Sequence, residues 1–153
     1  MNLSTQAPIL LVEDSNEDME LIKWALKKLS ISVPVVRCTD GGEALDYLYQ
    51  REEFSKPELA PRPALILLDL HLVAVDGIEV LQEIKHNEEL CMIPVIIWTT
   101  SSDPHDIEVS FQQGANSYIL KPMSVERLLS VIDMLNRYWF GFAVLPEHDL
   151  GPS

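Results

Sequence analysis

The sequence is poor in the features that mark several common classes of protein. Its only two cysteines, Cys38 and Cys91, have no C-x-x-C or Cys/His spacing, so it offers neither a disulfide framework nor a thiolate metal site. Its apolar runs are far shorter than a membrane span, and no charged segment followed by an apolar stretch begins the chain. We therefore expect a cytoplasmic protein with two free structural thiols.

Basic residues are also scarce. The 11 Lys and Arg residues face 24 Asp and Glu residues, which gives a net charge of −13 and disfavours direct binding to nucleic acid or to an anionic membrane surface. Hydrophobic residues make up 47% of the 153 positions, enough for a buried core in one domain. We expect a single domain over 1–153, with a core over about 8–137 and an aromatic tail over 138–153.

Short apolar runs alternate with helical patterns along the chain. The runs predict strands at 9–12, 33–38, 65–68, 95–98 and 117–120, and helical spacing predicts helices at about 16–29, 42–50, 77–87, 104–114 and 124–138. This alternation requires right-handed crossovers between parallel strands. The predicted fold is an α/β, doubly wound (βα)5 flavodoxin-like three-layer sandwich with sheet order 2-1-3-4-5.

Several helix starts are marked by polar residues. Ser15, followed three residues later by Asp18, has the form of a capping box, in which each side chain bonds the other residue's backbone N–H. Asp76 predicts a second N-cap, and Asp103 followed by Pro104 predicts a third. A Ser/Thr/Gly-rich phosphate loop does not follow the first strand, which argues against a flavodoxin-like flavin carrier.

Carboxylates stand where the first and third strands end. Glu13 and Asp14 follow the first strand and Asp69 follows the third, and these strands are neighbours in the predicted sheet order. Such carboxylates repel by roughly 4 kcal/mol per pair at ~4 Å and an effective dielectric of ~20, so a cation is needed among them. Because the cluster offers only oxygen ligands, the sequence favours Mg²⁺.

Two further polar residues end the fourth and fifth strands. Thr99 presents a hydroxyl and Lys121 a cation toward the same edge of the sheet. A metal, a carboxylate nucleophile, a cation and a hydroxyl form the minimum set for phosphoryl transfer. In this interpretation Asp69 attacks the phosphorus.

The set Glu13-Asp14, Asp69, Thr99 and Lys121-Pro122 resembles the signature of two-component response regulator receiver domains over nearly the whole chain. The resemblance implies that a sensor histidine kinase transfers a phosphoryl group to Asp69 in a phosphorelay. It also implies that Thr99 and Lys121 bind the phosphoryl oxygens. By this resemblance the protein is a phosphoacceptor that signals through protein contacts, and not an enzyme for a separate substrate.

The same resemblance assigns a metal site and a switch residue. Mg²⁺ would be held by Glu13, Asp14, Asp69 and the main-chain carbonyl of His71. Tyr118 matches the switch aromatic, whose inward or outward rotamer reports the state of Thr99. The side chain of His71 has no second histidine at a ligand spacing, so we expect it to control water access instead of binding metal.

Two segments resemble those of a narrower group, the cyanobacterial phytochrome response regulators. They are the loop over 51–63 and the tail from Tyr138-Trp139-Phe140 to Val144-Leu145-Pro146. This resemblance implies that the partner kinase is of the phytochrome type.

Two alternatives stay open. An aspartate-nucleophile phosphatase resembling haloacid dehalogenases needs a second Asp two residues after the nucleophile, where this chain has His71. A degenerate receiver that acts as an unphosphorylated adaptor is the second alternative, although every expected site residue is present.

The last predicted helix has more apolar surface than one core-facing stripe needs, which predicts a homodimer through this helix and the tail. The alternative is a tail that folds back over its own domain. The inward stripe is expected to hold Val125, Leu128, Leu129, Ile132, Leu135 and Trp139. A second row holds Val131, Met134 and Tyr138, and the tail adds Phe140, Phe142, Val144 and Leu145.

Overall fold

The computed structural model describes residues 6–146, so residues 147–153 of the predicted tail lie outside it. Five parallel strands form one sheet in the order β2-β1-β3-β4-β5, as predicted. The strands are β1 (Ile9–Val12), β2 (Val35–Cys38), β3 (Leu65–Leu68), β4 (Val95–Thr99) and β5 (Ser117–Leu120). The helices are α1 (Asn16–Lys28), α2 (Gly41–Tyr49), α3 (Gly77–His86), α4 (Pro104–Gln112) and α5 (Val125–Arg137).

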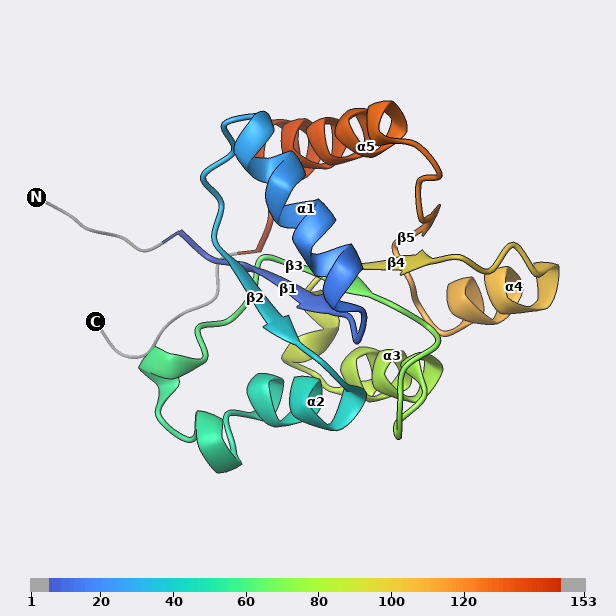
Figure 1. Cartoon of the computed structure of the whole chain (residues 1–153). Coiled ribbons are helices and arrows are strands. Elements are labelled where there is room, and N and C mark those ends of the chain that lie inside the picture. The colour runs from blue at the N-terminus through green and yellow to red at the C-terminus, as the bar shows by residue number, and fades with distance from the viewer. Residues whose placement is uncertain (1–5, 147–153) are drawn as a thin grey trace, which may run out of the picture.

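Helices cover both faces of the sheet, which gives the three-layer sandwich (Figure 1). On one face α1 and α5 pack on side chains such as Leu11 and Leu67, and on the other α2 and α3 pack on side chains such as Val12 and Leu68. Every residue of β3 is buried because its successive side chains enter these two cores in turn. The fold class and the strand order predicted from the sequence are therefore confirmed.

The predicted caps are present, with one correction. The side chains of Asp76 and Asp103 accept backbone N–H groups at the starts of α3 and α4. Ser15 caps α1 by accepting the N–H of Asp18 at 3.2 Å. The reciprocal half of the capping box is wrong, because the N–H of Ser15 donates to Glu13 at 3.2 Å and the carboxylate of Asp18 lies elsewhere.

The loop over 51–63 is more ordered than its composition indicates. It contains short 3-10 turns at Glu52–Phe54 and Pro57–Leu59. The hydroxyl of Tyr47 in α2 donates to the carbonyl of Pro61 at 2.7 Å, and the Tyr47 ring meets Phe54 edge to face. The loop is thereby fastened to α2. A third 3-10 turn, Leu90–Met92, precedes β4 and was not predicted.

The faces of α5 differ from the prediction at two positions. Val131, predicted in the outer row, is buried, and Val125, predicted in the inward stripe, is 49% exposed. The buried residues Leu128, Val131, Ile132 and Leu135 follow the i, i+3, i+4, i+7 spacing of a single stripe, so Val131 belongs to the core-facing stripe.

The segment after α5 lies partly on its own domain. It forms a π-helix, Tyr138–Phe142, in which Trp139 and Phe140 pack against the core beneath α1 and α5. Phe142 is 79% exposed and Val144 is 96% exposed. Within the described residues, the folded-back alternative therefore holds for Trp139 and Phe140, while Phe142 and Val144 stay exposed. Among residues 6–146, no helix has the length and apolar character needed to cross a membrane, and both cysteines are free.

Candidate functional site

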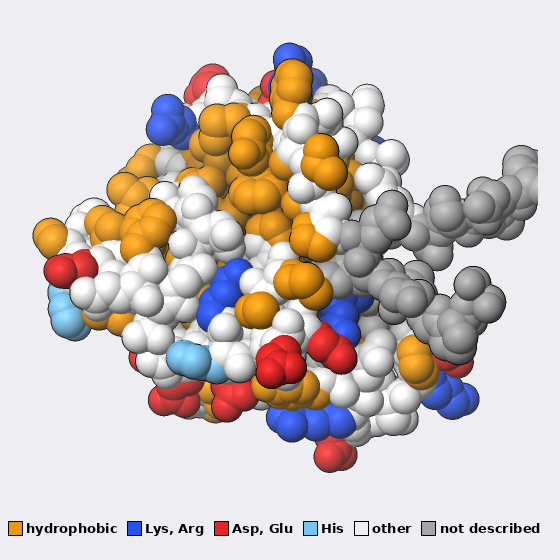
Figure 2. Space-filling view, turned by 180° about the vertical axis from the view of Figure 1, so that it is seen from behind, with side chains coloured by type: hydrophobic (Ala, Val, Ile, Leu, Met, Phe, Trp, Pro, Cys, Tyr) orange, Lys and Arg blue, Asp and Glu red, His pale blue; other side chains and the backbone are white. Residues whose placement is uncertain are grey.

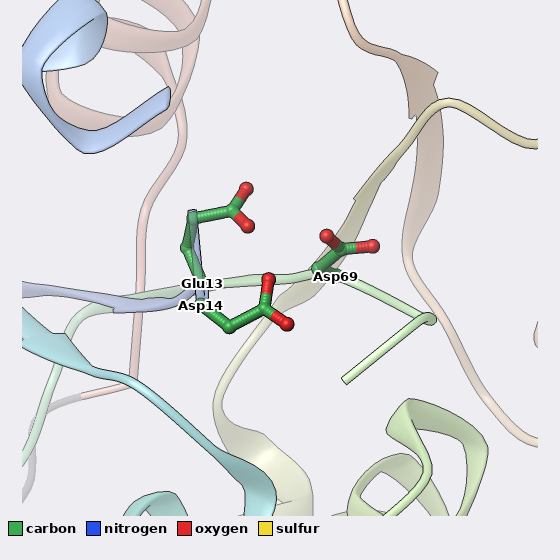
Figure 3. A group of neighbouring side chains, drawn as sticks. All are labelled: Glu13, Asp14 and Asp69. Atoms are coloured by element: carbon green, nitrogen blue, oxygen red, sulfur yellow. The ribbon is translucent and has the colours of Figure 1, made fainter. Parts of the chain in front are cut away.

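Three carboxylates meet at the carboxyl edge of the sheet, on the loops that follow β1 and β3 (Figure 3). Glu13, Asp14 and Asp69 each present an oxygen within 4.8 Å of the others. Glu13 and Asp69 are buried, whereas Asp14 is exposed. The predicted cluster therefore forms, with its open side at Asp14.

Backbone bonds hold the two loops at this edge. The N–H of Asp69 donates to Val12 at 3.1 Å, and the N–H of Glu13 donates to Cys38 at 3.0 Å. Arg37 in β2 donates from Nε to the carbonyl of Glu13 at 2.9 Å. The parallel pairing that builds the sheet thus also fixes the spacing of the carboxylates.

Lys121, immediately after β5, places its ammonium group among the acids. Its Nζ lies 2.9 Å from Oδ2 of Asp69 and 2.6 Å from Oε1 of Glu13. The contact with Glu13 is an ion pair by distance, but that oxygen accepts no well-directed hydrogen bond. Lys121, predicted to reach this edge of the sheet, therefore lies among the carboxylates.

Burial and charge shift the pKa values of these groups in defined directions. Burial raises the pKa of Glu13 to about 7, although the neighbouring Lys121 opposes this rise. Burial alone lowers the pKa of Lys121, but its close contacts with the carboxylates of Asp18, Glu13 and Asp69 outweigh burial and raise the pKa. The lysine therefore stays charged, while Glu13 binds a proton far more readily than an ordinary glutamate.

The carboxylate of Asp69 is held in one orientation by two donors. Its Oδ2 accepts from Lys121, and its Oδ1 accepts from the backbone N–H of His71 at 3.1 Å. The first residue of α3, Gly77, lies directly against the backbone here, since a Cβ built on it would be 2.3 Å from the Asp69 carbonyl. A glycine at this position lets α3 approach the residue that carries the carboxylate.

Thr99 lies beside the lysine and is buried. Its carbonyl accepts the N–H of Lys121 at 2.7 Å across the β4–β5 pair. Its hydroxyl oxygen accepts the N–H of Ser101 at 3.2 Å, so its own proton remains available to a further acceptor.

Ser101 joins the threonine to two other elements. Tyr118 in β5 is half-buried and donates from its hydroxyl to the Ser101 carbonyl at 2.7 Å. The hydroxyl of Ser101 donates to Asp106 in α4 at 2.6 Å. The predicted switch pair, Thr99 and Tyr118, is thus connected through a residue that sequence reasoning did not select.

The side chain of His71 lies at the rim of the site. It is 62% exposed, and its Nε2 is 3.8 Å from Oδ2 of Asp106. A role in controlling water access remains a prediction, since its side chain faces α4 and not the three carboxylates.

Sequence reasoning missed Asp18, Arg37 and Ser101. Asp18 contacts Lys121, which is 103 residues away in sequence, and its position in the first turn of α1 reads as a simple helix cap. Ser101 carries only a weak signal, its place two residues after Thr99. These contacts depend on tertiary structure, and local spacing does not reveal them.

The donor set fits a hard divalent cation. Three carboxylates with mutually close oxygens and no sulfur or imidazole ligand among them match the preferences of Mg²⁺. Asp14 leaves one side open to solvent, which suits an ion that keeps some of its waters.

Fold and site together define a class of protein. A doubly wound sheet with paired acids after β1, a buried aspartate after β3 and a lysine after β5 is the arrangement of a phosphoacceptor receiver domain. The response regulator receiver domain family matches residues 9–133, and the chain belongs to this family.

Phytochrome response regulators are among the similar proteins. Response regulator Rcp1 of Synechocystis sp. is 39% identical over 138 residues, which cover 90% of this chain and 92% of that protein. The crystal structure of the phosphorylated cyanobacterial phytochrome response regulator RcpA has a TM-score of 0.85 at 39% identity, covering 93% of this chain and 99% of that one. The Mn²⁺-bound form of Rcp1 has a TM-score of 0.83 at 38% identity, covering 92% and 99%. The chain is therefore similar to proteins of phytochrome signalling.

Proposed function

We propose that this protein is a single-domain, cytoplasmic response regulator that accepts a phosphoryl group on Asp69 from a sensor histidine kinase. It then signals through contacts with other proteins. The observation that carries the proposal is the carboxylate of Asp69 held 2.9 Å from Lys121 beside two more acids.

In this function an oxygen of Asp69 forms a bond to the phosphorus of a phosphohistidine. The phosphorus–nitrogen bond breaks, and the imidazole nitrogen leaves with its electron pair. Lys121 neutralises the developing charge on the phosphoryl oxygens, and the Thr99 hydroxyl donates a hydrogen bond to one of them. These roles are supported by the positions of both groups at the edge of the sheet.

Mg²⁺ is the proposed cofactor. Glu13, Asp14, Asp69 and the main-chain carbonyl of His71 would hold it, and the ion would supply positive charge to the phosphoryl oxygens. The existence of an Mn²⁺-bound form of the relative Rcp1 supports a divalent ion as the cofactor.

The proposed kinase is of the phytochrome type. This rests on the similarity to Rcp1 and to the phytochrome response regulator RcpA. A groove between α1 and the β5–α5 loop opens beside Lys121 and is lined by apolar side chains that include Leu21, Pro122 and Met123. It offers the kinase an apolar surface next to the acceptor.

The function is tested by incubating the protein with a small acyl phosphate and Mg²⁺ and measuring its intact mass. The wild type should gain one phosphoryl group only when the divalent ion is present, and Asp69→Asn should gain none. An alkali-labile phosphoryl group on Asp69→Asn would show that the acceptor is assigned wrongly. A wild type that is never modified would favour an unphosphorylated adaptor.

A homodimer through α5 and the tail is also part of the proposal. Figure 2 shows hydrophobic side chains gathered on the face seen from behind, in its upper part where α5 lies. Exposed apolar side chains of this region are Val125, Met134, Tyr138, Phe142 and Val144. These apolar side chains are more stable when buried against a second copy than when exposed to water. Phosphorylation would change the dimer only as far as the two states differ in contacts.

Sedimentation of the full chain and of a variant ending at Arg137 tests the dimer. The full chain should sediment as a dimer at micromolar concentration, and the shortened chain should be mostly monomeric. A monomeric full chain, with and without phosphoryl group, would contradict the dimer. A shortened chain that stays dimeric would instead place the contact on α5 alone.

A further inference from the structure

Asp18, in the first turn of α1, contacts the lysine of the site. Its Oδ2 lies 2.7 Å from Nζ of Lys121, a shorter distance than the 2.9 Å between that Nζ and Asp69. The side chain of Lys121 is 13% exposed and that of Asp18 is 31% exposed. The pair therefore sits at the boundary between the buried acids and solvent.

Helix capping does not account for this carboxylate. Ser15 caps α1 by accepting the backbone N–H of Asp18, and the N–H of Ser15 is taken by Glu13. The side chain of Asp18 is thus free of the cap and is directed across to the β5–α5 loop. An acid in this helical turn is favourable for the macrodipole, but Glu17 beside it already provides that charge.

The other acids around Lys121 would also interact with a bound metal ion. When a divalent cation occupies the pocket, Glu13 and Asp69 share their negative charge with it, so each attracts the lysine less strongly. The added positive charge also repels the ammonium group. Asp18 is outside the group of three carboxylates that converge, and it keeps its full charge for the lysine.

We propose that Asp18 is a positioning residue for phosphotransfer: it tethers the ammonium group of Lys121 at the mouth of the acidic pocket while the metal is bound. The inference rests on the proposed phosphorylation of Asp69. With the tether in place, the ammonium group already faces Asp69 when the phosphoryl group arrives. Without it, a long lysine side chain must be ordered at each transfer.

The first test compares Asp18→Asn with Glu17→Gln, which removes the same charge from the same turn of α1. With saturating Mg²⁺ and a small acyl phosphate, Asp18→Asn should lower the phosphorylation rate constant by about tenfold, in the range of one charge-assisted hydrogen bond. Glu17→Gln should change it by less than about twofold. Equal rates in the two variants would overturn the proposal.

A double-mutant cycle shows whether Asp18 acts through the lysine. In a Lys121→Met background, the further change Asp18→Asn should leave the residual rate unaltered. A full tenfold decrease in that background would instead show that Asp18 acts on its own, for example through the stability of α1.

Nuclear magnetic resonance of the lysine ammonium groups gives a readout that needs no phosphotransfer. With Mg²⁺ bound, the Lys121 signal, assigned by its loss in Lys121→Met, should exchange slowly in the wild type and in Glu17→Gln. It should be lost to fast exchange in Asp18→Asn. An unchanged signal in that variant would refute the tether. A wild type that keeps this signal but is never phosphorylated would refute the proposed function and leave the tether intact.

Discussion

The substitution Glu13→Gln should stabilise the metal-free protein at alkaline pH. Glu13 is fully buried, and burial raises its pKa from 4.5 to about 7. The folded state therefore binds a proton in the interval between these values that the unfolded chain has already lost. Stability must fall as the pH rises through this interval, and the loss is complete above pH 7.

The magnitude follows from the shift. One pKa unit corresponds to about 1.4 kcal/mol, so the charged Glu13 costs the metal-free fold up to about 3 kcal/mol at pH 8. Glutamine keeps the shape and removes the charge. Lys121 does not lose all its partners in this variant, since Asp18 and Asp69 still contact its Nζ.

Urea unfolding in a chelator at pH 5 and pH 8 measures the effect. At pH 8 the midpoint of Glu13→Gln should lie about 1 M above that of the wild type, and at pH 5 the two should agree closely. Glu17→Gln, at an exposed position of α1, is the matched control and should follow the wild type. Saturating Mg²⁺ should reduce or reverse the difference, because the wild type gains more from binding the ion.

Two results would refute this reasoning. One is a midpoint of Glu13→Gln at pH 8 in chelator that is equal to or below that of the wild type. The other is a gain of the same size at pH 5 and pH 8, which would show that the effect does not come from the ionisation of Glu13.

Two further substitutions test the geometry of the site. Gly77→Ala should destabilise the fold by about 1–3 kcal/mol and slow phosphorylation, because its Cβ would lie 2.3 Å from the Asp69 carbonyl. Thermal unfolding and mass kinetics measure this, and Gly42→Ala, whose Cβ would meet only Asp40 at 3.3 Å, should be tolerated. Asp14→Asn should weaken Mg²⁺ binding at least about tenfold in a tryptophan fluorescence titration, because a charged ligand is lost. An unchanged titration would place the ion elsewhere.

Much of the fold could be predicted because its signals are local. The apolar run of β3 ends at Asp69, and a strand buried on both faces has to lie inside a covered parallel sheet. The alternation of strands and helices indicates a parallel doubly wound sheet, and with the flavodoxin-like strand order the convergence of Glu13, Asp14 and Asp69 at one edge follows as well.

The remaining details depend on the directions in which side chains point in the folded protein, and the spacing of residues along the sequence does not determine these directions. Val131 is buried and Val125 is exposed, the reverse of the prediction. Apolar residues cover more of α5 than the core-facing stripe needs, and spacing alone does not decide which of them face the core. Asp18 was taken for a cap residue because its partner, Lys121, is distant in sequence. Trp139 and Phe140 pack against their own domain. Composition alone could not distinguish this arrangement from packing against a second copy.

The bonds of Ser101 bear on how a signal leaves the site. Its N–H donates to Thr99, its carbonyl accepts from Tyr118, and its hydroxyl donates to Asp106 and accepts the N–H of Asp103. A displacement of the Thr99 hydroxyl would therefore be transmitted to β5 and α4 through Ser101. Because packed elements shift between discrete arrangements and do not deform continuously, the surface that these two elements share should respond in an all-or-none manner.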